Sequence, residues 1–292
     1  MLTGGRGMLG RTVCRVLADD FELVPTDLPE VDVTDAAGVR AALLRHRPDA
    51  VIHCAAMTAV DACETRREQA KALNETGSAN VAAVCAESGV RLVAISTDYV
   101  FDGDLDRPYR ETDAATGGRT VYGQTKFAGE ERVRALCPDH VIARLAWLYG
   151  DGGPSFVHTM LKLADGGRDE LMVVGDQIGN PTSAAAVARE LREVLLRPGL
   201  RGTFHMTCEG EATWADFAEE IFRLAGRRQK VRRCTTAEFP RPAPRPANSR
   251  LEKAALRAAG LPPMPVWRTA LAEFIAREFQ GLRAGNPAGA PL

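Results

Sequence analysis

The sequence predicts an α/β fold, a doubly wound parallel sheet of the Rossmann type with a smaller C-terminal substrate-binding lobe. Three observations support this prediction. Short apolar runs alternate with helical stretches through the first half of the chain, which is typical of a parallel sheet covered on both faces. A glycine-rich turn directly precedes the first helical stretch. Beyond Tyr149–Pro154 the alternation becomes less regular, which indicates a second lobe.

The first half supplies four apolar runs and four helical stretches that must connect by right-handed crossovers. Asp35 is placed to cap a helix start, and Pro48 and Gly89 follow helix ends. Only Met1–Thr3 precede the glycine turn, so either the central first strand is very short or the natural chain begins further upstream. Strands are expected at Phe21–Pro25, Ala50–His53, Arg91–Ser96 and Val141–Leu145, and helices at Met8–Leu17, Ala36–Arg45, Arg67–Ser88 and Val121–Ala135.

The second half is predicted to be mainly helical. We expect a nucleotide-binding Rossmann domain over 1–146, a substrate-binding lobe over 147–282 from which some chain crosses back, and a flexible Gly/Pro/Ala tail over 283–292. Helices are expected at Phe156–Leu163, Ala184–Leu196, Trp214–Leu224, Ser249–Ala259 and Val266–Phe279, and strands at Leu171–Val174 and Thr203–Thr207.

The composition excludes several classes of protein. A formal net charge of −1 over 292 residues argues against a nucleic-acid surface, which needs a concentrated positive field. No apolar run approaches the roughly 20 residues that span a bilayer, and no secretory signal is visible, so we expect a cytoplasmic protein. The seven cysteines are scattered without a Cys-x-x-Cys pair, so no metal site is expected.

The first candidate site is the turn Gly4-Gly5-Arg6-Gly7-Met8-Leu9-Gly10, whose glycines recur every three residues before a helix. Such glycines allow a tight turn and let a pyrophosphate approach the helix N-terminus. An acidic residue, Asp27, follows the next predicted strand, where a carboxylate can accept the ribose hydroxyls of NAD. The pattern therefore predicts a nicotinamide dinucleotide as the cofactor.

Two side chains give opposite indications about which dinucleotide is used. Arg6 could pair with the 2′-phosphate of NADPH, whereas Asp27 would repel that phosphate. We expect NADPH, with NADH also usable. Asp32 could reach the adenine edge, or it could serve as a loop cap.

The second candidate site is Tyr122-Gly123-Gln124-Thr125-Lys126. Residues four apart share one helix face, so the ammonium of Lys126 is expected beside the phenol of Tyr122. A neighbouring cation stabilises phenolate and lowers the pKa of the phenol. Upstream, Ser96 and Thr97 follow the predicted strand at Arg91–Ser96. Thr97 is expected to hydrogen-bond a substrate carbonyl that Tyr122 protonates, with Ser96 as the competing candidate.

The chain resembles the extended short-chain dehydrogenase/reductases and, within them, the dTDP-4-dehydrorhamnose reductase family. The resemblance runs from the glycine turn to about Phe279, and its most specific stretch is Ser96–Gly103. Other family-like stretches are Thr58–Asp61, Tyr122–Lys126, Arg144–Gly150, Gly175–Thr182 and Arg245–Ser249.

The resemblance implies a role for each candidate residue. Thr97, Tyr122 and Lys126 would be catalytic, with Lys126 also holding the cofactor ribose, and Trp147 would pack on the sugar. Asn74 and His53 are interpreted as structural or cofactor-lining. The remaining cofactor-binding candidates are Gly4, Arg6, Gly7, Met8, Leu9, Gly10, Asp27, Asp32, Ala55 and Ala56, and the substrate-binding candidates are Thr97, Asp98, Tyr99, Val100, Trp147, Asn180, Arg245 and Asn248.

The activity implied by the resemblance is NAD(P)H-dependent reduction of the 4-keto group of a nucleotide-activated deoxysugar, most simply dTDP-4-dehydro-L-rhamnose. Leu145-Ala146 stands where the family often carries a hydroxyl-bearing pair before the tryptophan, so another dTDP-deoxyhexose in natural-product glycosylation is an alternative. A second alternative is a non-catalytic binding protein like the regulatory β subunit of methionine adenosyltransferase. The intact Thr97, Tyr122 and Lys126 favour an enzyme. A homodimer is compatible with the sequence.

Overall fold

The computed structural model describes residues 1–279, and the tail predicted over 283–292 lies outside them. Its centre is a six-stranded sheet in which every pair of neighbours is parallel. The chain pairs β1 with β2 on one side and with β3 on the other, so the order reverses between β1 and β3. Across the sheet the strands are β2 (Pro25–Thr26), β1 (Leu2–Thr3), β3 (Ala50–His53), β4 (Arg91–Thr97), β5 (His140–Leu145) and β10 (Gly202–His205).

The first strand is central, buried and only two residues long. Its shortness explains the one misplaced strand of the first half. The sequence predicts a strand over Phe21–Pro25, but β2 covers Pro25–Thr26 because β1 offers only Leu2 and Thr3 as partners. The prediction for β3 is confirmed as made, and those for β4 and β5 are confirmed to within one residue.

Alternate side chains of the strands enter two different apolar cores. Val93 of β4 and Ile52 of β3 pack with one core, while Leu92 and Val51 beside them pack with the other. All four side chains are almost fully buried. Because successive strand residues point to opposite faces, this pattern requires cover on both sides of the sheet.

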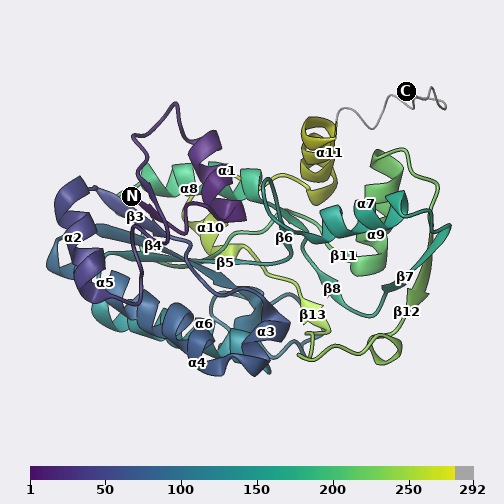
Figure 1. The fold of residues 1–292 in the computed structure, drawn as a ribbon, viewed down its shortest axis with the longest axis horizontal. Helices are drawn as coiled ribbons and strands as arrows, with labels where there is room; N and C mark the ends of the chain where they lie inside the picture. The colour runs from purple at the N-terminus through teal and green to yellow at the C-terminus, as the bar shows by residue number, and fades with distance from the viewer. Residues whose placement is uncertain (280–292) are drawn as a thin grey trace.

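Helices supply that cover, as Figure 1 shows. α1 (Met8–Val16) and α8 (Ala184–Leu195) lie against one face and pack on each other. The other face carries α2 (Ala36–His46), α5 (Gly77–Glu87) and α6 (Val121–Leu136). Asp35 caps α2 by accepting a hydrogen bond from the Ala37 amide, as its position predicts.

The helix predicted over Arg67–Ser88 is interrupted. It consists of α4 (Arg67–Lys71), a π-helical turn η1 (Ala72–Thr76) and α5. Asn74 in this turn is fully buried. Its Oδ1 accepts from the Met57 amide at 2.8 Å, and its Nδ2 donates to Thr125 of α6 at 3.0 Å. Such π turns often mark functional positions, and this one ties the loop after β3 to α6.

Part of the second half crosses back to the large sheet. β10 pairs with β5 and α8 covers the sheet near α1. Of the remaining elements, α10 (Ala254–Ala258) packs against β10 of the large sheet, and most of the others lie toward the opposite end of the molecule from α2 (Figure 1). These others are α7 (Phe156–Asp165), β7 (Glu170–Val174), α9 (Trp214–Leu224), β12 (Lys230–Cys234), the short strands β6 (Leu148–Tyr149), β8 (Ile178–Gly179), β9 (Thr182–Ser183), β11 (Ala212–Thr213) and β13 (Asn248–Ser249), and the helix α11 (Trp267–Glu278).

One prediction for this half is wrong in part. The helix predicted over Ser249–Ala259 begins only at Ala254, because Asn248–Ser249 pairs with β8 as strand β13. The basic run Arg227–Arg233, much of which is exposed, contains part of strand β12, which pairs with β7. Among residues 1–279, no helix is long and apolar enough to cross a membrane.

Candidate active site

A cavity of about 380 Å³ opens at the carboxyl ends of β1, β3, β4 and β5. This position, beside the point where the strand order reverses, is where open α/β sheets bind ligands. Its lining comes from the glycine turn, the loop after β3, the end of β4, the start of α6 and the segment after β5, and includes Gly4, Gly7, Met8, Leu9, Gly10, Cys54, Ala56, Ser96, Thr97, Asp98, Tyr99, Tyr122, Leu145, Ala146 and Trp147.

The glycine turn has no room for side chains. A Cβ on Gly10 would lie 2.3 Å from the Gly4 carbonyl oxygen, and one on Gly4, whose φ is +67°, would lie 2.7 Å from the Ala55 amide nitrogen. α1 starts at Met8, and its N-cap, Gly7, provides no side-chain cap. The first amides of α1 therefore face the cavity without a side-chain acceptor, which fits a pyrophosphate at this helix N-terminus.

A second cavity of about 670 Å³ lies on the outer side of the turn and contains both cofactor-discriminating candidates. Asp27 accepts hydrogen bonds from the backbone amides of Arg6 and Leu28, each at 2.9 Å. The Arg6 guanidinium donates to the Leu28 carbonyl and forms an exposed ion pair with Glu30. The structure therefore brings Arg6 and Asp27 together, with Glu30 as an acidic neighbour that the sequence reasoning missed.

Of the other cofactor candidates, some line a cavity and others do not. Ala56 lines the cavity of about 380 Å³ at the strand ends, which we call the inner cavity, and Ala55 lies against Gly4. Asp32 is exposed, and its Oδ1 accepts from the amide and hydroxyl of Thr34. Of the two roles considered for Asp32, this contact corresponds to the loop cap. Asp32 lines none of the three cavities described in residues 1–279.

The structure distinguishes the two hydroxyls at the end of β4. Ser96 donates to the buried Glu130 carboxylate at 2.5 Å. Thr97 donates to Asp98 Oδ1 at 2.9 Å and accepts from the Tyr99 amide at 3.2 Å. Ser96 is held by the buried ion pair of Glu130 with Arg144, whereas the partner of Thr97 is the neighbouring Asp98, which lines the cavity with it. Thr97 is therefore the better candidate to turn its hydroxyl toward a ligand. Burial raises the pKa of Asp98 to about 6, with the Thr97 hydrogen bond acting against it.

Tyr122 is buried at the start of α6, which Thr120 caps through the Gly123 amide at 3.0 Å. Its ring meets that of Tyr99 edge to face, with centroids 5.5 Å apart. Burial raises the pKa of the phenol well above its ordinary value, and a hydrogen bond with Thr97 opposes that rise. Tyr122 and Thr97 line the same cavity.

Lys126 is placed differently from the expectation. It lies one turn after Tyr122 on the same helix, but its Nζ donates to the Ile95 carbonyl of β4 at 2.7 Å. Burial lowers the pKa of this ammonium to about 8, and the negative charge of Glu130 acts against that lowering. Desolvation is the largest influence on the pKa of the Tyr122 phenol, and it acts opposite to the lowering expected from a neighbouring cation.

A buried ionic network behind this site was not predicted. Glu130 receives a bidentate ion pair from Arg144 of β5, at 2.9 and 2.7 Å, in addition to the Ser96 hydroxyl. The Arg144 guanidinium also lies 5.0 Å from the centre of the Phe101 ring. The sequence feature that could have predicted this network is Glu130, which lies four residues after Lys126 and therefore on the same helix face.

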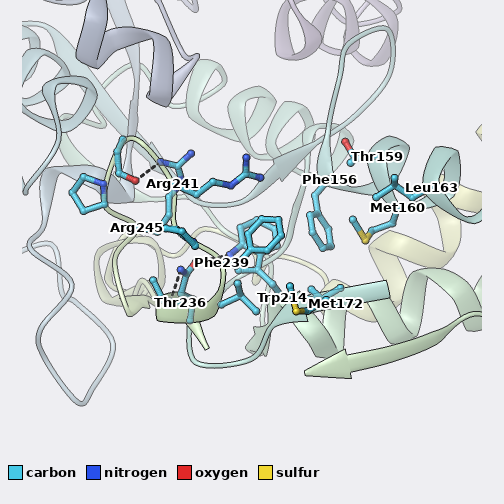
Figure 2. Close-up of a pocket in the computed structure, with 16 residues that line it drawn as sticks. Phe156, Thr159, Met160, Leu163, Met172, Trp214, Thr236, Phe239, Arg241 and Arg245 are labelled. Atoms are coloured by element: carbon cyan, nitrogen blue, oxygen red, sulfur yellow. Dashed lines mark hydrogen bonds between the residues drawn. The ribbon is translucent and has the colours of Figure 1, made fainter. Parts of the chain in front are cut away.

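A third cavity, of about 600 Å³, lies beyond Trp147 in the C-terminal lobe (Figure 2). Trp147 stacks on Trp214, a lining residue that sequence reasoning missed although the chain has only three tryptophans. Figure 2 shows aromatic rings at its centre, with Arg241 and Arg245 toward one end. We call it the outer cavity, and its apolar lining includes Phe156, Met160, Leu163, Met172, Trp214 and Phe239.

Of the remaining substrate candidates, Arg245 alone lines the outer cavity. It forms an ion pair with Asp61 of α3 (Val60–Thr65) at 3.0 Å. Asn180 and Asn248 are both buried and hydrogen-bond backbone groups. The partners of Asn180 are Gly210 and Leu251. Those of Asn248 are Leu105, Arg107 and Arg250.

Val100, the last substrate candidate, is fully buried in a cluster with Phe101 and Tyr109. The structure therefore gives Asn180, Asn248 and Val100 contacts that brace loops rather than line a cavity. His53 of β3 is also buried, and its ring nitrogens contact Thr3 and Ser78. This burial supports a structural role for His53.

A Rossmann sheet with a glycine cradle at its switch point, with Thr97 and Tyr122 around one crevice and Lys126 buried behind it against Ile95, defines a nicotinamide-dependent oxidoreductase of the short-chain dehydrogenase/reductase type. The family model described as RmlD substrate binding domain matches residues 1–279. The chain belongs to this family.

Curated relatives are similar over almost their whole length. The chain is 44% identical to dTDP-4-dehydrorhamnose reductase of Streptomyces griseus, with 100% of this chain and 97% of that protein covered. It is 45% identical to a probable dTDP-4,6-dihydroxy-2-methyloxan-3-one 4-ketoreductase of Streptomyces antibioticus, with 98% of each covered. A solved dTDP-4-dehydrorhamnose reductase from Bacillus anthracis in complex with NADP superposes with a TM-score of 0.91 at 36% identity, covering 94% of this chain and 98% of that one.

Proposed function

We propose that this protein is an NADPH-dependent reductase of the 4-keto group of a dTDP-linked deoxysugar, most simply dTDP-4-dehydro-L-rhamnose. The observation that carries the proposal is the convergence of Thr97, Asp98 and Tyr122 on the cavity that the glycine turn also lines. Relatives of 44–45% identity that carry reductase names support the same reaction class. The bound nicotinamide would supply the hydride that reduces the carbonyl carbon.

The chain's own residues would manage the carbonyl oxygen. Thr97 would turn its proton from Asp98 to that oxygen and polarise it. Tyr122, which lines the same cavity as Thr97, would donate the proton that the developing alkoxide takes up. Lys126, fixed at the Ile95 carbonyl, would hold the ribose of the cofactor and keep a positive charge in the buried crevice.

The two cavities on either side of Trp147 match the two parts of a nucleotide sugar. The inner cavity would take the sugar against Trp147, and the outer cavity would take the nucleotide. The outer cavity is mainly apolar, as a base requires, and Arg241 and Arg245 line it together. Guanidinium groups are well suited to a diphosphate because they bind phosphate oxygens in pairs.

A second candidate substrate is the 4-keto sugar of another dTDP-deoxyhexose. Leu145 and Ala146 line the inner cavity next to Trp147, so the sugar meets apolar side chains where the family often offers hydroxyls. The near-equal identity to a rhamnose-type reductase and to another 4-ketoreductase supports keeping both candidates. A purely regulatory binding protein would have no use for the buried Tyr122–Thr97 pair, and we do not favour it.

The experiment that decides among these substrates is a panel of dTDP-4-keto-6-deoxyhexoses offered with NADPH or NADH. Loss of nicotinamide absorbance would report turnover, and product analysis would report the configuration at C4. We expect turnover with NADPH on at least one member of the panel. Dinucleotide binding without turnover on any keto sugar would contradict the proposed reaction.

Tyr122→Phe tests the role of the phenol. We expect turnover to fall by roughly 10²–10⁴, which is the usual contribution of a positioned proton donor, while NADPH affinity stays near that of the parent protein. Tyr109→Phe is a suitable control, because the Tyr109 hydroxyl does not line the inner cavity. It accepts hydrogen bonds from the backbone amides of Gly103 and Asp104. Near-normal turnover of Tyr122→Phe would rule out Tyr122 as the donor.

A further inference from the structure

Trp147 and Trp214 form one parallel stack between the inner and outer cavities. Their ring centroids are 3.5 Å apart and their planes differ by 7°. Trp147 lines the inner cavity and Trp214 lines the outer cavity. The two rings come from segments far apart in the sequence, and together they form the wall that the cavities share.

Trp147 is held in an unfavourable backbone conformation. Its φ is +47°, a left-handed value that a bulky residue adopts only when its surroundings enforce it. The Thr182 amide donates to the Trp147 carbonyl at 3.1 Å. Gly179 lies against the indole, where an added Cβ would come within 2.5 Å of Trp147 Cε2. The ring therefore has close neighbours in Gly179 and Trp214 that restrict its position.

Trp214 is itself firmly placed. Its Nε1 donates to Gln177 Oε1 at 3.1 Å, and Gln177 Nε2 donates to Thr236 Oγ1 at 2.9 Å. Its backbone begins α9 directly after Thr213, which forms a capping box with Asp216. A ring fixed by a hydrogen bond and by a capped helix start can hold a stacked partner in one orientation.

We propose that Trp214 is a positioning residue for the reduction, which acts by holding Trp147 in the orientation that forms the wall of the sugar site. This inference rests on the proposed function. The stack supplies contacts that keep Trp147 in its strained backbone conformation. Without them the indole leaves its place, and the sugar loses its platform beside Thr97 and Tyr122. The glycine turn belongs to other elements, so cofactor binding stays intact.

The first test replaces the ring of Trp214. Trp214→Leu removes the stack, and we expect the KM for the keto sugar to rise about tenfold, which is the value of one aromatic pair, with a smaller change in kcat. Trp214→Phe keeps a ring at this place and should recover most of the loss. NADPH affinity, measured by fluorescence titration without sugar, should be unchanged in both variants.

The second test is a double-mutant cycle, because Trp214 also lines the outer cavity and could contact the nucleotide directly. If Trp214 acts through Trp147, Trp214→Leu should have no further effect on KM in a Trp147→Leu background. If the two effects multiply, Trp214 acts by itself and the proposal is overturned. Gly179→Ala, which intrudes on Trp147 from another element, should raise KM in the same way as Trp214→Leu.

A spectroscopic measurement gives a readout independent of turnover. Two stacked indoles couple electronically, so the parent protein should show an exciton couplet in its circular dichroism spectrum that Trp214→Leu abolishes. Trp267→Phe is the matched control. Trp267 lines none of the three cavities described in residues 1–279 and binds the Glu211 carbonyl in the core, so the couplet and the KM should persist.

The outcomes separate the two proposals. A parent protein that turns over no keto sugar contradicts the proposed function, whatever its spectrum. An active parent in which Trp214→Leu leaves both KM and the couplet unchanged contradicts the positioning role alone. An active parent with a raised KM, a lost couplet and a non-additive cycle supports both.

Discussion

Two histidines show how burial sets the charge of single residues in this protein. His53 lies between Thr3 and Ser78, and Nδ1 of His205 donates to the Glu252 carbonyl at 2.8 Å. Burial lowers the pKa of each to about 3. Both imidazoles are therefore neutral near pH 7, and neither is available to exchange a proton with a substrate at that pH.

The same shift predicts how stability depends on pH. Because these pKa values are depressed from about 6.5 in the unfolded chain, the unfolded state binds more protons between about pH 6.5 and about pH 3. The free energy of unfolding should therefore fall as pH decreases through this window, by up to roughly 1.4 kcal/mol per pH unit for each histidine.

His205→Gln tests this prediction, since an amide can still bond the Glu252 carbonyl. The free energy of unfolding, measured with denaturant at several pH values, should fall less steeply toward acid pH than in the parent protein. The difference in slope should correspond to about one proton. His46→Gln, at an exposed position at the end of α2, should keep the parent slope. An unchanged slope in His205→Gln would mean that His205 is not a buried neutral group.

Helix α6 is the element that brings the predicted catalytic residues into one crevice. It approaches the turn after β4 at Gly123, where an added Cβ would lie 2.2 Å from the Tyr99 carbonyl oxygen. It approaches the π turn at Gly129, where a Cβ would lie 2.3 Å from the Asn74 carbonyl oxygen. The two glycines let α6 approach closely enough for Tyr122 to reach Thr97.

Gly123→Ala is predicted to separate α6 from the turn after β4. The methyl group would push Tyr122 away from Thr97, and a displacement on the order of 1 Å in a catalytic constellation can reduce kcat roughly a hundredfold. Gly199→Ala is the matched control, because a Cβ there meets no heavy atom within 4 Å. Steady-state kinetics and thermal unfolding should show lost turnover in a folded protein. A kcat near that of the parent would show that the close approach at Gly123 is not needed.

At the scale of the whole molecule, the proposed site needs both the large sheet and the C-terminal half. Asp61 of α3 accepts from Arg245 Nη2 and from the Ala243 amide, at 3.0 and 3.1 Å. These contacts tie the Pro-rich loop Phe239–Pro246 to the segment that follows β3. Both ionic side chains are partly buried, so the pair is less weakened by solvent than an exposed one.

Asp61→Asn is predicted to loosen this connection. We expect the KM for the dTDP-linked keto sugar to rise by about three- to tenfold, in line with the loss of a charge-assisted hydrogen bond, while NADPH affinity is retained. Glu273→Gln removes an exposed ion pair with Arg189, which joins α8 to α11 away from the cavities, and should leave KM unchanged. A parent-like KM in Asp61→Asn would show that the loop is held by other contacts.

Much of this fold could be predicted from local sequence alone. α9 is predicted to the residue, and α1, α2 and α6 are predicted to within one, because apolar periodicity and helix caps are properties of neighbouring residues. The glycine turn and the spacing of Tyr122 and Lys126 are local in the same sense. They determined the fold class, the cofactor class and the candidate proton donor.

The tertiary structure decided what depends on residues far apart in the chain. The choice between Ser96 and Thr97 depends on Glu130, which binds Ser96 from a distant part of the chain. The pKa of Lys126 depends on the burial of its ammonium against β4. The place of β12 depends on its partner β7, since a run of basic residues carries no strand pattern. The stack of Trp147 on Trp214 joins two segments with no shared periodicity. Such contacts form only when the whole chain packs, and they shape the cavities that would select the sugar.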